Sequence, residues 1–149
     1  MGFMDKLKSM KNMVTGGGAK ISLQVDGTVS PGEKVAVVVR CQVEGAAISA
    51  TKVYVAARAV ETVNLVREQR GERDRVHDTE TTFSQEFTIH GAVSLPANST
   101  HEWRGEITLP TNVQPTYRGK HAKHEWEFLA AIDVAGNDPD SGWIDVRVR

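Results

Sequence analysis

The segment Leu109-Pro110-Thr111-Asn112-Val113-Gln114-Pro115-Thr116-Tyr117-Arg118-Gly119-Lys120 separates two stretches in which apolar and polar residues alternate. Trp103 and Ile107 before the segment, and Leu109 at its start, are apolar residues at odd positions. After the segment, a long alternating stretch begins at His121. A period of two predicts strands that are buried on one face. Two prolines and a glycine predict an irregular connector between them. This part of the chain therefore predicts two strands of a sheet with a shaped connection.

Similar strand patterns recur along the rest of the chain, separated by turns such as Ser30-Pro31-Gly32-Glu33. We expect strands within residues 21–25, 35–43, 48–63, 83–89, 92–95, 103–109, 121–132 and 144–148. No helix pattern lies between them, so parallel βαβ units are not expected. The pattern predicts an all-β sandwich of about eight strands.

Composition sets limits on the function. The chain has 149 residues, enough for one domain with a sizeable core, and its net charge is −1. It has no apolar stretch long enough to span a membrane and no secretory signal, so a cytoplasmic protein is expected. Met1 and the strand pattern at 144–148 predict a complete chain. Cys41, the only cysteine, is at an alternate strand position and is expected to be buried and inert.

The first 18 residues differ from the remainder. Apolar residues recur there at helical spacing, between lysines, and Gly16-Gly17-Gly18 follows. The apolar positions are Phe3, Met4, Leu7, Met10, Met13 and Val14. We expect an amphipathic helix and joint over 1–18, and a β domain over 19–149. The helix could pack on its own sheet, on a second copy or on a membrane surface, or this segment could be a disordered tail.

Three features occur in an order that resembles the arrestin-like domains. Ser30-Pro31-Gly32-Glu33 precedes a valine-rich strand, the connector at 109–120 has a Leu-Pro and a Pro-Thr-Tyr, and a long inner strand follows at 126–133. Gly2-Phe3-Met4-Asp5-Lys6-Leu7 and Gly17-Gly18-Ala19-Lys20 are similar to the start of the bacterial sporulation-control branch. The resemblance implies an arrestin-like, immunoglobulin-like β-sandwich. It also implies a cytoplasmic adaptor or regulator that works by protein contact.

The chain departs from this family in size. Arrestin-like proteins and the bacterial branch usually carry two sandwiches, whereas this chain has room for one. Functions that use the cleft between two domains are therefore not carried over, and no motif matches the phosphate-sensing polar core of animal arrestins. The resemblance does not imply a role in sporulation.

Few residues suggest chemistry. Asp133, Asp138 and Asp140 are weak candidates for calcium ligands, but an Asx-type turn explains the same sequence. His121 and His124, three apart on a strand, would point to opposite faces and not bind one metal ion. A hydrogen-bonded histidine at a strand end is expected instead. The catalytic and phosphate-binding motifs that we considered are absent from the sequence. We therefore expect no cofactor, no metal and no enzymatic activity.

The remaining candidates concern binding. Residues 67–80 are strongly charged and are expected to form a solvated hairpin tip or flexible loop, without the interleaved aromatic residues that would favour nucleic acid. Tyr117 and Arg118 are candidates for partner contact on the connector, together with Phe3, Leu7 and Met10 on the helix. The leading hypothesis is an adaptor that binds protein through a strand edge, the charged loop and the helix, with possible self-association. The alternative is a peripheral membrane protein anchored by the helix.

Overall fold

A computed structural model of the chain describes residues 18–149. The predicted helix, with Phe3, Leu7 and Met10, lies outside the described residues. The described part contains β1 (Ala19–Val25), β2 (Lys34–Val43), β3 (Ile48–Ala50), β4 (Lys52–Gln69), β5 (Glu72–His90), β6 (Val93–Leu95), β7 (Thr100–Thr108), β8 (Tyr117–Arg118), β9 (Ala122–Asp133) and β10 (Ile144–Val146). The all-β prediction is confirmed, and the two strands that raise the number from eight to ten are the short β3 and β8.

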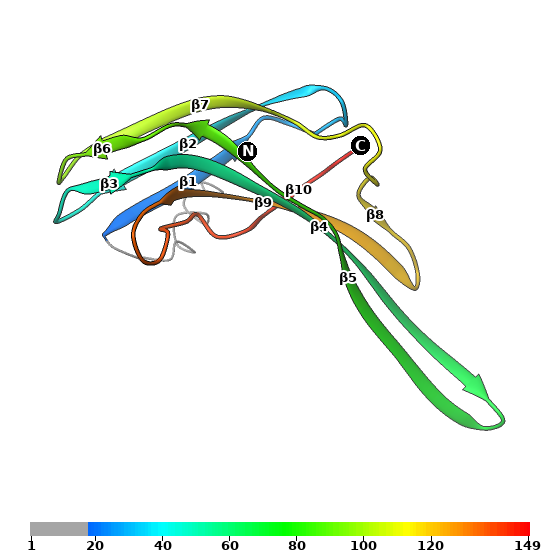
Figure 1. Ribbon diagram of the computed structural model, residues 1–149. Helices are drawn as coiled ribbons and strands as arrows, with labels where there is room; N and C mark the ends of the chain where they lie inside the picture. The colour runs from blue at the N-terminus through cyan, green and yellow to red at the C-terminus, as the bar shows by residue number, and fades with distance from the viewer. Residues whose placement is uncertain (1–17) are drawn as a thin grey trace.

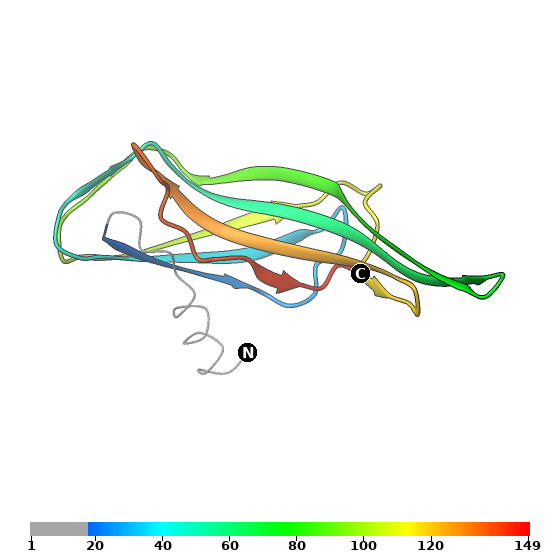
Figure 2. The same cartoon turned by 90° about the horizontal axis from the view of Figure 1, so that it is seen from below.

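The strands form two main sheets that face each other (Figures 1 and 2). One sheet has the order β1-β2-β7, and the other has the order β10-β9-β4-β5, with β8 also paired to β9. Strands β3 and β6 form a small separate ladder. Every named pair of strands is antiparallel.

Alternation along the strands places the core between the two sheets. In β2 the buried residues are Val35, Val37, Val39, Cys41 and Val43, and in β9 they include Trp126, Phe128, Ala130 and Ile132. Each large apolar side chain fully buried in this way contributes roughly 1.5–3 kcal/mol to folding. The predicted burial of Cys41 is confirmed, and burial raises the pKa of its thiol to about 11.

Strands β4 and β5 continue beyond the sandwich as a two-stranded hairpin (Figure 1). Residues 52–63 of β4 pair with β9, whereas residues 64–69 pair only with 72–77 of β5. We call residues 64–77 the arm. Arg70 and Gly71 connect its strands with φ of 55° and 79°, as a type I′ turn requires. Of the two predictions for residues 67–80, the hairpin tip is confirmed and the flexible loop is wrong, because these residues form a paired hairpin.

The turn at Ser30–Glu33 and the connector at 109–120 meet in space. The Gly32 backbone N–H donates to the carbonyl of Leu109 at 2.8 Å. Gly32 has a φ of +81°, and a Cβ there would lie 2.7 Å from Cγ2 of Thr111. The connector also accepts a hydrogen bond from the Trp126 indole at the carbonyl of Gln114, at 2.8 Å. Two sequence features far apart in the chain thus build one corner of the sandwich.

Candidate functional site

Strand β1 is an edge strand whose outer backbone groups have no strand partner among residues 18–149. Antiparallel ladders alternate between residues that bond across the pair and residues that do not. Glu44 N–H donates to Gly18 O at 2.7 Å, and Asp26 N–H donates to Ala36 O at 3.0 Å. Even-numbered residues of β1 therefore bond to β2. The N–H groups of the odd residues 21, 23 and 25 point away from β2, to the open edge.

The open edge of β1 is regular along its whole length. Its seven residues pair with β2 from Ala19 to Val25 without a register shift. Its inward side chains at 19, 21 and 23 are buried in the core, which fixes the strand in place. Lys20, its only charged residue, is already paired with Glu44 at 3.1 Å. An edge of this kind carries little protection against the pairing of another strand.

Three other edge strands within residues 18–149, β5, β7 and β10, are less suited to strand addition. Strand β5 has register shifts opposite Val53/Tyr54 and Ala59/Val60, which interrupt its ladder, and its distal half is highly charged. Strand β7 carries three charged residues in alternation, Glu102, Arg104 and Glu106. Strand β10 is three residues long. Bulges, charges and shortness are the usual devices that discourage strand addition, so β1 is the most accessible edge.

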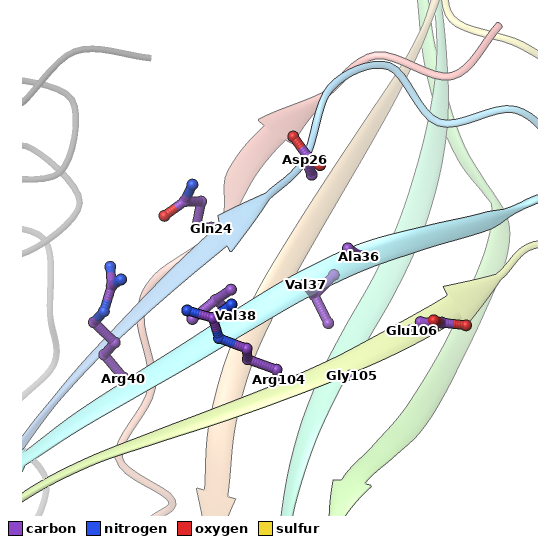
Figure 3. A pocket seen from close by; sticks show the side chains of 9 residues that line it. All are labelled: Gln24, Asp26, Ala36, Val37, Val38, Arg40, Arg104, Gly105 and Glu106. Atoms are coloured by element: carbon purple, nitrogen blue, oxygen red, sulfur yellow. The ribbon is translucent and has the colours of Figure 1, made fainter.

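The outer surface of the β1-β2-β7 sheet holds a shallow hollow of about 470 Å³ (Figure 3). Gln24 and Asp26 border it on the β1 side, Arg40 lies on β2, and Arg104 and Glu106 lie on β7. Its lining includes the small side chain of Ala36. The hollow therefore adjoins the open edge of β1 and is lined by both positively and negatively charged side chains.

The carboxylate of Glu102 accepts hydrogen bonds from both arginines of this hollow. Arg40 Nε donates to Glu102 Oε1 at 2.7 Å, and Arg104 Nε donates to Oε2 at 3.3 Å. These hydrogen bonds, first that from Arg40, hold the pKa of Glu102 below its usual value. The arrangement keeps both guanidinium groups in place beside the hollow, where they can meet polar groups of a bound chain.

The predicted contact residues Tyr117 and Arg118 lie elsewhere, on β8 at the base of the arm. Tyr117 is 38% exposed, donates its hydroxyl to Glu61 at 3.0 Å and stacks on His124. The hydrogen bond to Glu61 raises the pKa of Tyr117. Arg118 pairs with Glu125 at 3.1 Å. Both side chains are accessible, but each already has an intramolecular partner.

The three aspartates form hydrogen bonds within the chain. Asp133 accepts from the hydroxyl of Thr51 at 2.7 Å, and Asp138 accepts from the hydroxyl of Tyr54 at 2.8 Å. Asp140 accepts from the N–H of Gly142 at 2.7 Å, as in an Asx-type turn. Among residues 18–149 no group of three His, Cys, Asp or Glu side chains is placed to hold a metal ion.

His124 is a structural residue. Its ring is completely buried, with Nε2 at 2.7 Å from the hydroxyl of Thr82 and Nδ1 at 2.8 Å from the carbonyl of Pro115. The prediction of a hydrogen-bonded histidine is confirmed. Its bond to Pro115 ties the connector to β9, as the indole of Trp126 does.

The sequence reasoning missed one exposed aromatic site. Trp143 is 38% exposed, and the guanidinium of Arg58 lies 3.8 Å from the centre of its ring. Arg58 also pairs with Glu127 at 2.7 Å. The sequence could have predicted this exposure. Ile144 and Val146 are the residues of β10 that face the core, and Trp143, one residue before Ile144, is therefore expected to point outward. Tryptophan and arginine on an outer sheet face are residues that often dominate protein interfaces.

Comparison with known proteins supports the fold. No family model matches the chain, and no curated protein matches it by sequence. Among solved structures, the sporulation control protein Spo0M from Bacillus subtilis is similar, with a TM-score of 0.62 and 21% identity. The match covers 89% of this chain and 50% of Spo0M, so the chain spans about half of that protein's length. The chain has the arrestin-like sandwich fold of Spo0M.

Within residues 18–149 the structure contains no helix that is long and apolar enough to cross a membrane.

Proposed function

We propose that this protein is a non-enzymatic adaptor that binds a partner protein by adding a strand to the open edge of β1. The observation that carries the proposal is the contrast between edges: β1 is regular and nearly uncharged, whereas β5 and β7 are bulged or charged. In strand addition, backbone hydrogen bonds supply affinity and the neighbouring side chains supply specificity. The hollow beside Gln24 and Arg40 lies where it would contact the side chains of an added partner strand.

The cellular setting belongs to the same proposal. The likeness to Spo0M, together with the Gly-Gly-Ala-Lys at 17–20, favours the bacterial sporulation-control branch and a cytoplasmic regulator. The alternative of a membrane-surface protein rests on residues 3–14 alone.

A proline on β1 tests the proposal. Val25→Pro removes an N–H that points to the open edge and leaves the ladder to β2 intact, because Val25 does not bond across that pair. Val25→Ala removes a similar part of the side chain and keeps the N–H. We expect the proline variant to lose partners that cross-link to the wild-type chain in its source cells, and the alanine variant to keep them.

Two outcomes would contradict the proposal. Partners retained by Val25→Pro would exclude the β1 edge. Partners lost from both variants would assign the effect to packing of the Val25 side chain and not to the backbone donor. Vesicles of anionic lipid, added to the same variants, would reveal membrane binding as an activity that is independent of residue 25.

A further inference from the structure

The arm has two faces of different chemical character, because residues opposite each other in the hairpin share a face. Leu65 pairs with Val76, and Val63 pairs with Asp78. This side continues the core-facing side of the sheet, since Ala59, two residues before Glu61, is fully buried. We call it the inner arm face; it comprises the odd residues 61–69 of β4 and the even residues 72–80 of β5, and so begins a few residues before the arm itself.

The inner arm face combines an apolar stripe with negative charge. Val63, Leu65 and Val76 form the stripe and are only half-buried. Val63 is the last residue of β4 that pairs with β9, and Leu65 and Val76 lie beyond it, where no second sheet covers them within residues 18–149. Five carboxylates and one arginine surround the stripe, which gives a formal charge of −4. The charged residues are Glu61, Arg67, Glu72, Asp74, Asp78 and Glu80.

The outer arm face has the opposite character. On β5 it carries Arg73, Arg75 and His77, and on β4 it carries Glu68, which pairs with Arg73 at 3.1 Å. Two copies of the arm could not pair well edge to edge along β5. In an antiparallel two-fold pairing, residues on the same face meet, so acidic residues would meet acidic residues and basic would meet basic. The apolar stripe and the negative charge of the inner arm face fit a basic, amphipathic segment instead.

The chain contains such a segment at residues 3–14. Lys6, Lys8 and Lys11 against Asp5 give it a formal charge of +2, and Phe3, Leu7 and Met10 recur at helical spacing. Its charge and its apolar face complement the inner arm face. An amphipathic helix laid against an apolar surface is a common mode of protein recognition.

Reach decides whether the segment could come from the same molecule. Strand β1, which follows Gly18 in the chain, begins at the end of the sandwich opposite the arm (Figures 1 and 2). Along β4, thirteen residues separate Lys52 at that end from Leu65 in the stripe, a span of about 43 Å. A helix over residues 3–14 measures about 18 Å, and the joint to Gly18 adds at most about 14 Å. The segment of the same chain therefore falls short.

We propose that residues 3–14 of one copy dock on the inner arm face of a second copy. Because Gly18 and the arm lie at opposite ends, two copies side by side in opposite directions bring each segment to the other's arm. This arrangement closes as a two-fold dimer. It uses a different surface from the β1 edge, so either proposal can fail without the other.

Sedimentation of the full-length protein tests the proposal with reversed charges. One variant carries Lys6→Glu, Lys8→Glu and Lys11→Glu, and another carries Asp74→Lys and Asp78→Lys. We expect the wild-type chain to form a dimer and each variant to dissociate at least about tenfold more readily. The first variant makes residues 3–14 negative, so that like charges face each other, and the second changes the formal charge of the inner arm face from −4 to 0. A mixture of the two variants should form a mixed dimer.

The control places the same two lysines on the outer arm face, as His77→Lys and Thr79→Lys. This variant should dimerise like the wild type. A wild-type chain that stays monomeric up to its solubility limit, a control that dissociates as much as the inner-face variant, or a mixture that forms no mixed dimer would each overturn the proposal.

Discussion

Single residues fix the corner that the connector builds. Gly32 has a positive φ, and its Cα faces the methyl group of Thr111, so any side chain there meets both backbone strain and a close contact. Gly27 has a similar φ of +78°, but a Cβ at that position would meet nothing within 4 Å. A comparison of Gly27 with Gly32 therefore separates the free-energy cost of a positive φ from the cost of the contact with Thr111.

We predict that Gly32→Ala lowers the free energy of unfolding more than Gly27→Ala does. The left-handed conformation alone costs about 1–2 kcal/mol, and the contact with Thr111 adds roughly 1–3 kcal/mol at Gly32. Adding Thr111→Ser, which removes the methyl group, should recover most of that excess. Urea unfolding of these three variants and the wild type measures the differences. Equal costs at the two glycines would show that the corner is not tightly packed.

At this scale the sequence was partly sufficient. It predicted the turn at Ser30–Glu33, the buried Cys41 and the hydrogen-bonded His124 from residue type and strand phase. It did not reveal that Gly32 and Thr111 touch, because contact between distant segments depends on how the two sheets are layered. Trp143 was missed although the phase of β10 pointed it outward.

Among the elements, the arm differs most from the sandwich strands. In the sandwich, β4 lies between β9 and β5, whereas residues 64–77 have one neighbouring strand each. An isolated two-stranded hairpin is marginally stable in water. Local opening should therefore be easiest in the arm.

Limited trypsin digestion checks this expectation. Within residues 18–149 we predict the first cuts after the arginines of the arm, such as Arg67 and Arg75, and later cuts after Arg40 and Arg58 in the sandwich strands. Peptide mass mapping at early times identifies the order. A first cut in β2 or in the sandwich part of β4 would contradict the arm's lower stability.

The elements also show where strand prediction succeeds. Strands β2 and the core half of β4 have alternating apolar residues and were located from the sequence. The arm was expected as a hairpin tip or loop, because its charged residues lack that alternation. Its strands form instead through cross-strand pairing and the Arg70-Gly71 turn. The short β8 has two residues, too few for a periodic pattern.

The whole molecule is a two-layer sandwich with open edges, and its edges differ in protection. The fold could be predicted because strand phase and the order of three motifs agree, and the likeness to Spo0M supports it. The open edge of β1 could not be predicted, because an edge is a property of strand order. The hollow beside it likewise depends on β7 lying next to β2.

Amide hydrogen exchange along β1, followed residue by residue in the full-length protein by NMR, tests the open edge most directly. An open edge predicts alternating exchange rates: fast exchange at Ile21, Leu23 and Val25, whose N–H groups point away from β2, and slow exchange at residues 20, 22 and 24. A bound partner strand should then slow the three odd residues. Slow exchange at all six residues in the free protein would show that the outer edge of β1 is already covered and not open to a partner strand.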